Sequence, residues 1–330
     1  MVLDLGFLGD TVHLLPALWM LRQGYGEARL HVMVARHVVS LMDCVPWVNR
    51  VWGYSRFPKH ASLGENLATV GRLRREHFDV VINLNGSDRS SWLTWLSGAR
   101  ERLGRVPLDG GPLLWRSMFT EVVEHPFTED PPYVQKCQCL RKCGFAGERP
   151  EFHIELPLKH LEQAGIGAAD RGTFFHFSPF TTDDDKELSI DKTAALADAL
   201  QEEFPDKKLA ISCAPNEREI KKMEALLARL KRRPWRVLAG NLSLVQLAGV
   251  IQQSCAHLSG DTGTLHLALM TGVPTVSWFR TEVGMKAWIP AGPRHRTILG
   301  LGMVSDSFRE VAVAELIGAV KSVVGPEGAR

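Results

Sequence analysis

Short β-rich runs alternate with helical stretches along nearly the whole chain, and this alternation restricts the fold more than any other feature of the sequence. The β-rich runs are Val2–Leu5, Leu30–Val34, Asp79–Leu84, Thr173–Ser178, Lys208–Cys213, Arg236–Ala239, Ala256–Leu258 and Thr275–Trp278. Helices are expected between them, at Leu63–Arg75, Leu113–Val123, Tyr133–Cys143, Ala194–Glu203, Glu217–Leu230, Leu244–Gln252 and Leu265–Thr271. Strands that alternate with helices in this way predict an α/β fold with parallel sheets.

The chain is long enough for two domains. Its 330 residues exceed the length at which a single hydrophobic core usually stops growing. Between Leu156 and Gly172 the sequence is rich in proline, glycine and polar residues, which indicates a link. We therefore predict two doubly wound, Rossmann-like domains, residues 1–160 and 161–330, that face a central cleft. The C-terminal helix expected at Arg309–Val323 could pack back on the first domain.

Composition and charge exclude several classes of protein. A formal net charge of +2 without a basic stripe is not typical of a nucleic-acid-binding protein. No apolar run is long enough to cross a bilayer, and the first residues lack the basic and apolar regions of a signal peptide. We expect a cytoplasmic protein that binds no nucleic acid.

Three of the six cysteines, Cys137, Cys139 and Cys143, are clustered in a C-x-C-x3-C pattern that could begin a metal site. They fall in an expected helix, however, where residues two positions apart point to different faces. No second pair of Cys or His residues at zinc-ligand spacing follows nearby. The sequence therefore predicts no metal site, and we expect no cofactor.

The segment Leu258–His266 is the sharpest local feature, because an apolar strand passes through a turn with two glycines into a helix. Glycines let a ligand approach the main chain, since no Cβ obstructs it. The free N–H groups and the dipole of the helix start favour an anion such as a diphosphate. Alternatively, Asp261 or Thr262 only caps the helix. His266 could reach the same ligand or be a structural group.

A second candidate is Thr181–Lys186, which follows the strand that ends at Ser178. Hydroxyl groups and a lysine after a strand can hold phosphate oxygens. The triplet Asp183–Asp185 suggests a divalent cation, because Mg²⁺ is often bound by carboxylates and substrate phosphates. Three consecutive aspartates in a loop cannot all converge on one ion, so a solvated charged loop is the simpler interpretation.

A third candidate is the glycine loop Gly6–Asp10, at a strand-to-helix junction in the first domain. Its G-x-x-G spacing does not match the dinucleotide-binding fingerprint. Asp10, which we expect to open the following helix, is either an N-cap or a general base at the rim of the cleft.

Two further side chains follow strand ends in the second domain. Glu217 opens an expected helix and could cap it or accept hydrogen bonds from a ribose diol. Leu242 could form an apolar wall for a nucleobase, next to Ser243 as the cap of another helix.

Taken in order, these motifs resemble glycosyltransferase family 9, the bacterial ADP-heptose heptosyltransferases. The family's strand, glycine loop ending in Gly-Asp and helix with an early proline are matched by Leu5–Ala17. Its Thr-Thr…Asp-Lys and Asp-Thr-Gly-x-x-His elements are matched by Thr181, Thr182, Asp185 and Lys186, and by Asp261, Thr262, Gly263 and His266. The resemblance spans nearly the whole chain and implies a GT-B fold and a metal-independent, inverting transfer of heptose or a related sugar.

The resemblance also implies a role for each matched residue. Asp10 is the expected general base for the acceptor hydroxyl, on an acceptor-side loop with Gly9 and His13. Lys186 is expected to stabilise charge on the departing nucleotide. The other expected donor ligands are Thr181, Thr182, Thr262 and Gly263 for the diphosphate, Glu217 for the ribose, Leu242 for the adenine, and Asp261 and His266 near the donor sugar. Asp10 and Lys186 come from different domains, so the resemblance implies that the cleft closes for reaction.

One departure concerns the acceptor. Family members usually place a basic residue just before the glycine loop, where this chain has Asp4. This difference suggests an acceptor other than the usual lipopolysaccharide inner core. We expect an ADP-sugar donor, a saccharide or lipid-linked saccharide acceptor such as a lipopolysaccharide core, and peripheral contact with the inner face of the inner membrane.

Three alternatives stay open. The chain could use another nucleotide sugar for a different glycan or a protein acceptor. It could be a nucleotide-sugar epimerase of the same fold, which needs no acceptor and releases no sustained ADP. It could also be a non-catalytic binding partner, although a binder would not need Asp10, Lys186 and Asp261 together.

Overall fold

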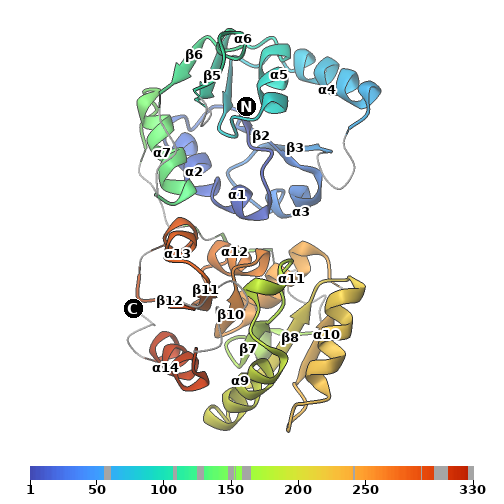
Figure 1. Ribbon diagram of the computed structural model, residues 1–330. Helices are drawn as coiled ribbons and strands as arrows, with labels where there is room; N and C mark the ends of the chain where they lie inside the picture. The colour runs from blue at the N-terminus through green and yellow to red at the C-terminus, as the bar shows by residue number, and fades with distance from the viewer. Residues whose placement is uncertain are drawn as a thin grey trace. The chain divides into compact units, whose positions relative to one another are not determined.

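The structure is a computed structural model that describes residues 1–55, 61–106, 110–124, 130–147, 152, 154–157, 165–240, 242–290, 292–300 and 311–325. The chain divides into two compact units, Met1–Phe152 and His153–Arg330, and each contains one sheet flanked by helices (Figure 1). The predicted boundary between residues 160 and 161 falls in the segment 158–164, outside the described residues, and stays a prediction. Within the described ranges, no helix has the length and apolar character needed to span a bilayer.

The first unit is built on six parallel strands in the order β3-β2-β1-β4-β5-β6. Its strands are β1 (Val2–Leu3), β2 (His31–Ala35), β3 (Arg50–Tyr54), β4 (Val80–Asn83), β5 (Glu101–Arg105) and β6 (Glu121–Val123). All residues of β1 and β2 are buried, as expected for parallel strands covered on both faces. The strand order reverses between β1 and β4, so the fold is doubly wound and its switch point lies between these two strands.

Seven α-helices and one short 3₁₀ segment surround the first sheet in the described part of the chain. They are α1 (Leu8–Val12), α2 (Leu15–Gly24), η1 (Arg36–Val38), α3 (Val39–Met42), α4 (Leu63–Arg75), α5 (Asp88–Leu96), α6 (Leu113–Arg116) and α7 (Pro132–Lys142). Helix α4 has the predicted bounds, because Ser62 and Glu65 form a reciprocal capping box at its start. Side chains of α4 and α5 pack on one face of the sheet, and α7 packs against α2.

The prediction of one helix over Leu113–Val123 was wrong in its second half. The helix ends at Arg116, and Glu121–Val123 form β6, which pairs in parallel with β5. The two adjacent valines of this strand are β-branched and favour an extended backbone beside a neighbouring strand.

The second unit repeats the architecture of the first, with six parallel strands in the order β12-β11-β10-β7-β8-β9. The strands are β7 (Phe174–Ser178), β8 (Lys208–Cys213), β9 (Arg236–Ala239), β10 (Ala256–Gly260), β11 (Thr275–Phe279) and β12 (His295–Leu299). Counted from β7, this is the same strand order as in the first sheet. The switch point therefore lies between β7 and β10, and the predicted α/β class with two doubly wound sheets is confirmed.

The helical segments of the second unit are η3 (Ala168–Asp170), η4 (Asp184–Lys186), α9 (Ile190–Glu203), α10 (Glu217–Leu227), α11 (Leu244–Gln253), α12 (Gly263–Met270), α13 (Glu282–Trp288) and α14 (Val313–Val324). Helices α9, α10 and α14 share one apolar core with β7, β8 and β10. A smaller core, which includes Phe174, Ala210 and Val250, lies on the opposite face of the sheet. Helix α14 contacts α9, β11 and β12 of its own unit, and its packing on the first unit stays a prediction.

Two buried histidines lie side by side at the centre of the second sheet. His176 on β7 and His257 on β10 are in register, their rings are stacked, and their Nδ1 atoms are 2.8 Å apart. Burial lowers the pKa of His176 to about 3, and burial together with the neighbouring ring lowers the pKa of His257 well below its ordinary value. Both rings are therefore neutral at pH 7, with one Nδ1 donating to the other.

Candidate functional site

The predicted donor residues gather at the switch point of the second sheet. The loop Thr181–Lys186 follows β7, and Asp261 follows β10, the strand paired with β7. Lys186 Nζ lies 2.6 Å from Asp261 Oδ2, so the structure brings these two predicted residues into direct contact. Ligands of doubly wound sheets bind at this point, beyond the carboxyl ends of the strands.

Gly260 allows the two loops to meet. A Cβ added at this position would lie 2.7 Å from the main-chain oxygen of Lys186 and 3.3 Å from Thr181 Cγ2. Such a Cβ would force the Thr181–Lys186 loop away from the end of β10. The glycine is therefore needed for close packing between the loops, and not only for access by a ligand.

Helix α12 begins at this site without a side-chain cap. Thr262 is its N-cap residue, but its side chain makes no capping hydrogen bond, and Asp261 is turned towards Lys186. The alternative that Asp261 or Thr262 serves only as a cap is therefore wrong. The start of α12, with Gly263 as its first residue, presents backbone N–H groups and the positive end of a helix dipole beside an ammonium group.

His266 belongs to the same cluster. It is buried in α12, and its ring packs edge-on against Trp288 of α13, with the centroids 5.1 Å apart. Burial lowers the pKa of His266 to about 4, although Asp261 acts in the opposite direction and Lys186 in the same direction. The imidazole is therefore neutral at pH 7 and lies within electrostatic reach of both partners.

The two predicted threonine ligands differ in their surroundings. Thr181 is buried, and its hydroxyl donates to the Asp183 carbonyl at 2.6 Å and accepts from the Asp183 N–H at 3.1 Å. This hydroxyl closes the turn that begins the loop. Thr182 is exposed, so its side chain is the more accessible of the two to a ligand.

The three consecutive aspartates point to different partners. Asp183 accepts a hydrogen bond from the Asp185 N–H, Asp184 is held by Lys222 at 2.6 Å, and Asp185 pairs with Arg280 at 3.4 Å. No group of three or more His, Cys, Asp or Glu residues suited to a metal occurs in the part of the chain that the structure describes. Of the clustered cysteines, Cys137 and Cys139 are buried in α7 and Cys143 is half-buried at its C-terminal end.

An ion-pair network behind the Thr181 loop was missed in the sequence. The Glu187 side chain is only 6% exposed, accepts from the Thr181 N–H at 2.8 Å, and pairs with Lys222 at 2.6 Å. Arg218 donates to the Thr181 carbonyl and pairs with Glu187 and Asp184. Arg218 and Lys222 are four residues apart on α10, and this spacing was the only signal available in the sequence. The network fixes the loop on α10.

The predicted ribose and adenine ligands lie on neighbouring loops. Glu217 is the first residue of α10, is exposed, and pairs with Lys221 at 2.6 Å. Asn216 caps this helix, so the alternative that Glu217 is the cap is wrong. Leu242 packs against the smaller core, and the neighbouring Gly240 has a φ of +73° and comes so close to Pro215 that a Cβ would overlap it. Only glycine suits this contact between the two loops.

In the first unit, Asp10 lies at the predicted glycine loop but in a different helical position. Helix α1 begins at Leu8, so Asp10 is its third residue and not its first. Asp10 Oδ2 accepts a hydrogen bond from the Phe7 N–H at 2.9 Å. A Cβ on Gly6 would lie 2.3 Å from Asp10 Cβ, so this carboxylate can occupy its place only next to a glycine.

The other two predicted residues of this loop are buried. Gly9 lies within α1, and His13 is fully buried at its C-terminal end. The His13 ring packs edge-on against Phe152 at 5.0 Å and near Tyr133 at 5.7 Å between centroids. The structure therefore places His13 in the core of the first unit and not on a surface where a ligand would meet it.

Asp4 has a basic partner that the sequence did not reveal. Its carboxylate lies 2.6 Å from Lys136 Nζ of α7, and both side chains are almost fully buried. The same ammonium donates to the main-chain oxygen of Asp10 at 2.6 Å. A positive charge is therefore present beside the glycine loop, although it comes from a distant helix.

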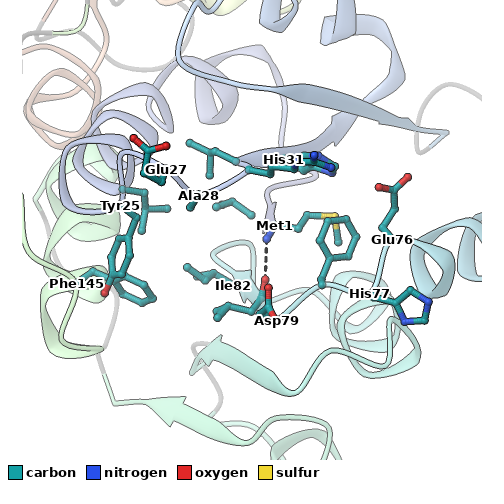
Figure 2. A pocket seen from close by; sticks show the side chains of 16 residues that line it. Met1, Tyr25, Glu27, Ala28, His31, Glu76, His77, Asp79, Ile82 and Phe145 are labelled. Atoms are coloured by element: carbon teal, nitrogen blue, oxygen red, sulfur yellow. Dashed lines mark hydrogen bonds between the residues drawn. The ribbon is translucent and has the colours of Figure 1, made fainter.

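A separate cavity of about 500 Å³ in the first unit contains none of the predicted site residues. Figure 2 shows Tyr25 and Phe145 at one end of it and His31 and Glu76 at the other. Its lining includes the amino ends of β1, β2 and β4, where the Met1 amine donates to the Val80 carbonyl at 2.7 Å. The cavity therefore lies at the amino ends of the strands, whereas the glycine loop follows the carboxyl end of β1.

Comparison with known proteins gives a consistent match. The model of the family "Glycosyltransferase family 9 (heptosyltransferase)" matches residues 67–310, a range that includes every predicted donor residue and ends before the C-terminal helix. Lipopolysaccharide heptosyltransferase 3 of Escherichia coli is 20% identical over 284 residues, which cover 83% of this chain and 81% of the relative.

Solved structures show the same fold. The glycosyltransferase family 9 protein of Veillonella parvula superposes with a TM-score of 0.80 at 17% identity, over 98% of this chain and 96% of that chain. E. coli heptosyltransferase WaaC with ADP-2-deoxy-2-fluoro heptose gives a TM-score of 0.78 at 17% identity, over 97% of this chain and 98% of that one. At this level of identity the likeness establishes the GT-B fold.

Proposed function

The chain belongs to glycosyltransferase family 9, and from this we propose that it transfers heptose or a related sugar from an ADP-sugar to a saccharide acceptor, with inversion at the anomeric carbon. The observation that carries the proposal is the contact between Lys186 and Asp261 beside the uncapped start of α12. This arrangement offers positive charge and hydrogen-bond donors to a diphosphate, and a carboxylate to the hydroxyls of a sugar.

Stabilisation of the leaving group is the first chemical requirement of such a transfer. When the bond between the anomeric carbon and the phosphate oxygen breaks, negative charge develops on the departing ADP. We assign Lys186, Thr182 and the first N–H groups of α12 to that charge, and Thr181 to the shape of the loop that carries them. Donors that are already in place when charge develops stabilise the transition state most effectively.

Removal of the proton from the acceptor hydroxyl is the second requirement. We assign Asp10 as the general base, which takes the proton of the acceptor hydroxyl while that oxygen forms its bond to the anomeric carbon. The proton goes to the Asp10 carboxylate, and the electron pair of the broken bond leaves with ADP. Asp10 belongs to the first unit and Lys186 to the second, so the proposed reaction requires both units.

The nucleoside of the donor would be bound by neighbouring loops of the second unit. Glu217 is exposed and would accept hydrogen bonds from the ribose hydroxyls, in exchange for its surface pair with Lys221. Leu242, which is half-buried, would form an apolar wall for the adenine. We assign His266 as a neutral neighbour of the donor sugar, since it lies close to Asp261.

We further propose a lipid-linked acceptor, such as a lipopolysaccharide core, met by a cytoplasmic enzyme at the inner face of the inner membrane. Large apolar side chains are exposed on two helices of the first unit, Trp92 and Trp95 on α5 and Leu113 and Leu114 on α6. Tryptophan and leucine at such positions favour an interface with lipid. We expect the parent protein to float with anionic vesicles, and a variant with serine at all four positions to float less. Equal flotation of the two proteins would exclude this surface.

A transfer assay tests the proposed reaction. The protein is incubated with ADP-heptose and a lipopolysaccharide core saccharide, and ADP and the extended saccharide are measured together. The proposal predicts equal amounts of both products. A changed sugar nucleotide without ADP would indicate the epimerase, and ADP-heptose that stays intact with every saccharide acceptor would contradict the transferase.

A further inference from the structure

The side chain of Lys136 joins both ends of the glycine loop in the first unit. Its ammonium lies 2.6 Å from Asp4 Oδ2, before the loop, and donates at 2.6 Å to the main-chain oxygen of Asp10, at the end of the loop. Asp4 in turn accepts from the Gly6 N–H through Oδ1 at 3.0 Å. The loop Gly6–Asp10 is thus held at its start and at its end by one buried ion pair.

The helix that carries Lys136 is itself fixed to the sheet. The preceding residue, Gln135, accepts a hydrogen bond from Arg105 of β5 at 2.6 Å, and both side chains are buried. Helix α7 also packs along α2, the helix that follows α1. The ammonium therefore acts from a rigid support, so its contact with Asp10 restricts the loop and not the helix.

Burial of the ion pair between Lys136 and Asp4 costs free energy of desolvation. The exposed fractions of the Lys136 and Asp4 side chains are 5% and 2%, so both charges lose most of their hydration. A buried ion pair often contributes no more to stability than two apolar side chains of the same volume, and its better-supported role is to specify one geometry. The geometry specified here is that of the loop that carries Asp10.

We propose that Lys136 is a positioning residue of the transfer reaction, which holds the Asp10 backbone so that its carboxylate meets the acceptor hydroxyl. This inference rests on the proposed role of Asp10 as the base. Asp10 is held from two sides, because its main-chain oxygen accepts from Lys136 while its side chain accepts from the Phe7 N–H. A base displaced by about 1 Å can lose about 10²-fold in rate, so a contact of this kind affects turnover without touching the substrate.

The test uses the full-length chain and a double variant. Lys136→Met alone would leave the Asp4 carboxylate buried without its partner, and the protein would lose stability for that reason. The combination of Lys136→Met with Asp4→Asn removes both charges, keeps similar volumes, and retains an oxygen that accepts from the Gly6 N–H. The hydrogen bond to the Asp10 carbonyl then lacks its donor. Lys142→Met is the matched control, because Lys142 lies on the same helix but bonds the Glu124 carbonyl at 2.9 Å near the surface.

Three measurements are made on each protein: thermal unfolding, the steady-state kinetics with ADP-heptose and a lipopolysaccharide core saccharide, and amide hydrogen exchange of peptides that cover residues 4–13. For the double variant we expect a Tm close to that of the parent, kcat lower by about 10–100-fold, a donor KM within about twofold, and exchange in the loop faster by about tenfold or more. The control should match the parent in all four.

The outcomes separate this inference from the proposed function. A folded double variant with the kcat of the parent overturns the positioning role, and so does unchanged exchange of the loop amides, whatever the activity of the parent. A parallel loss of Tm, kcat and donor affinity would show a merely structural role. A parent protein that releases no ADP from any ADP-sugar overturns the proposed function, while the exchange experiment still decides whether Lys136 orders the loop.

Discussion

Replacement of Lys186 by methionine is predicted to remove most of the transfer activity and to leave the fold nearly intact. The Lys186 and Asp261 side chains retain 37% and 20% of their exposure, so solvent screens their ion pair and its contribution to stability is about 0.2–1 kcal/mol. A donor to charge that develops in the transition state contributes far more, about 10²–10³-fold in kcat or about 2.7–4 kcal/mol. Expressed as free energies, the expected loss of transition-state stabilisation is therefore several times larger than the expected loss of folding stability.

The assay compares initial rates of ADP release and thermal unfolding for the parent, Lys186→Met and a control. Lys231→Met is a suitable control, because Lys231 lies in the same unit, is exposed, and pairs with Glu202 at 3.5 Å. We expect Tm values within a few degrees for all three proteins and a large fall in kcat for Lys186→Met alone. A kcat within about threefold of the parent would refute the assignment of Lys186 to the leaving group.

Three further predictions follow from the same structure. Asp10→Asn should retain ADP binding but lower kcat by about 10²–10⁴-fold, and kinetics within a few-fold of the parent would exclude Asp10 as the base. Gly260→Ala should weaken ADP binding measured by calorimetry and lower stability by about 1–3 kcal/mol, because its Cβ would lie 2.7 Å from the Lys186 carbonyl; unchanged affinity would show that the loops tolerate separation. The free energy of unfolding measured in urea should fall in acid. Burial lowers the pKa of His176 to about 3 in the folded protein, so this histidine binds a proton more readily in the unfolded chain. The associated stability is complete above about pH 6.5 and falls towards pH 3 by roughly 5 kcal/mol, so a free energy of unfolding that is constant between pH 7 and pH 4 would contradict this.

Strands and helices were predicted with the right bounds where their apolar runs and capping residues are unambiguous in the sequence. The strands Lys208–Cys213 and Arg236–Ala239 and the helix Leu63–Arg75 have the predicted bounds. The strands β3, β5 and β12 were not predicted, because each combines charged residues with only a few apolar ones. They lie at or near the edges of the sheets, where burial on both faces is incomplete and the apolar signal is weaker.

The donor site was the more predictable part of the candidate site. Local motifs place Lys186 and Asp261 after two strands, and parallel pairing of those strands brings the two side chains together. Lys136 could not be found in this way, since it lies 126 residues from Asp10 and reaches it only through the packing of α7. The burial of His13 likewise depends on rings that come from distant segments, Tyr133 and Phe152.

The proposed ADP-sugar donor is tested most directly by a thermal-shift panel on the parent protein with ADP, UDP, GDP, CMP and ADP-heptose, in EDTA. A ligand at about 100 times its Kd stabilises a folded protein by about 2.7 kcal/mol, which is readily measured as a rise in Tm. We expect stabilisation by ADP and ADP-heptose and by none of the other nucleotides, without any added metal. Stabilisation by UDP instead of ADP, or a response only when Mg²⁺ or Mn²⁺ is present, would contradict it.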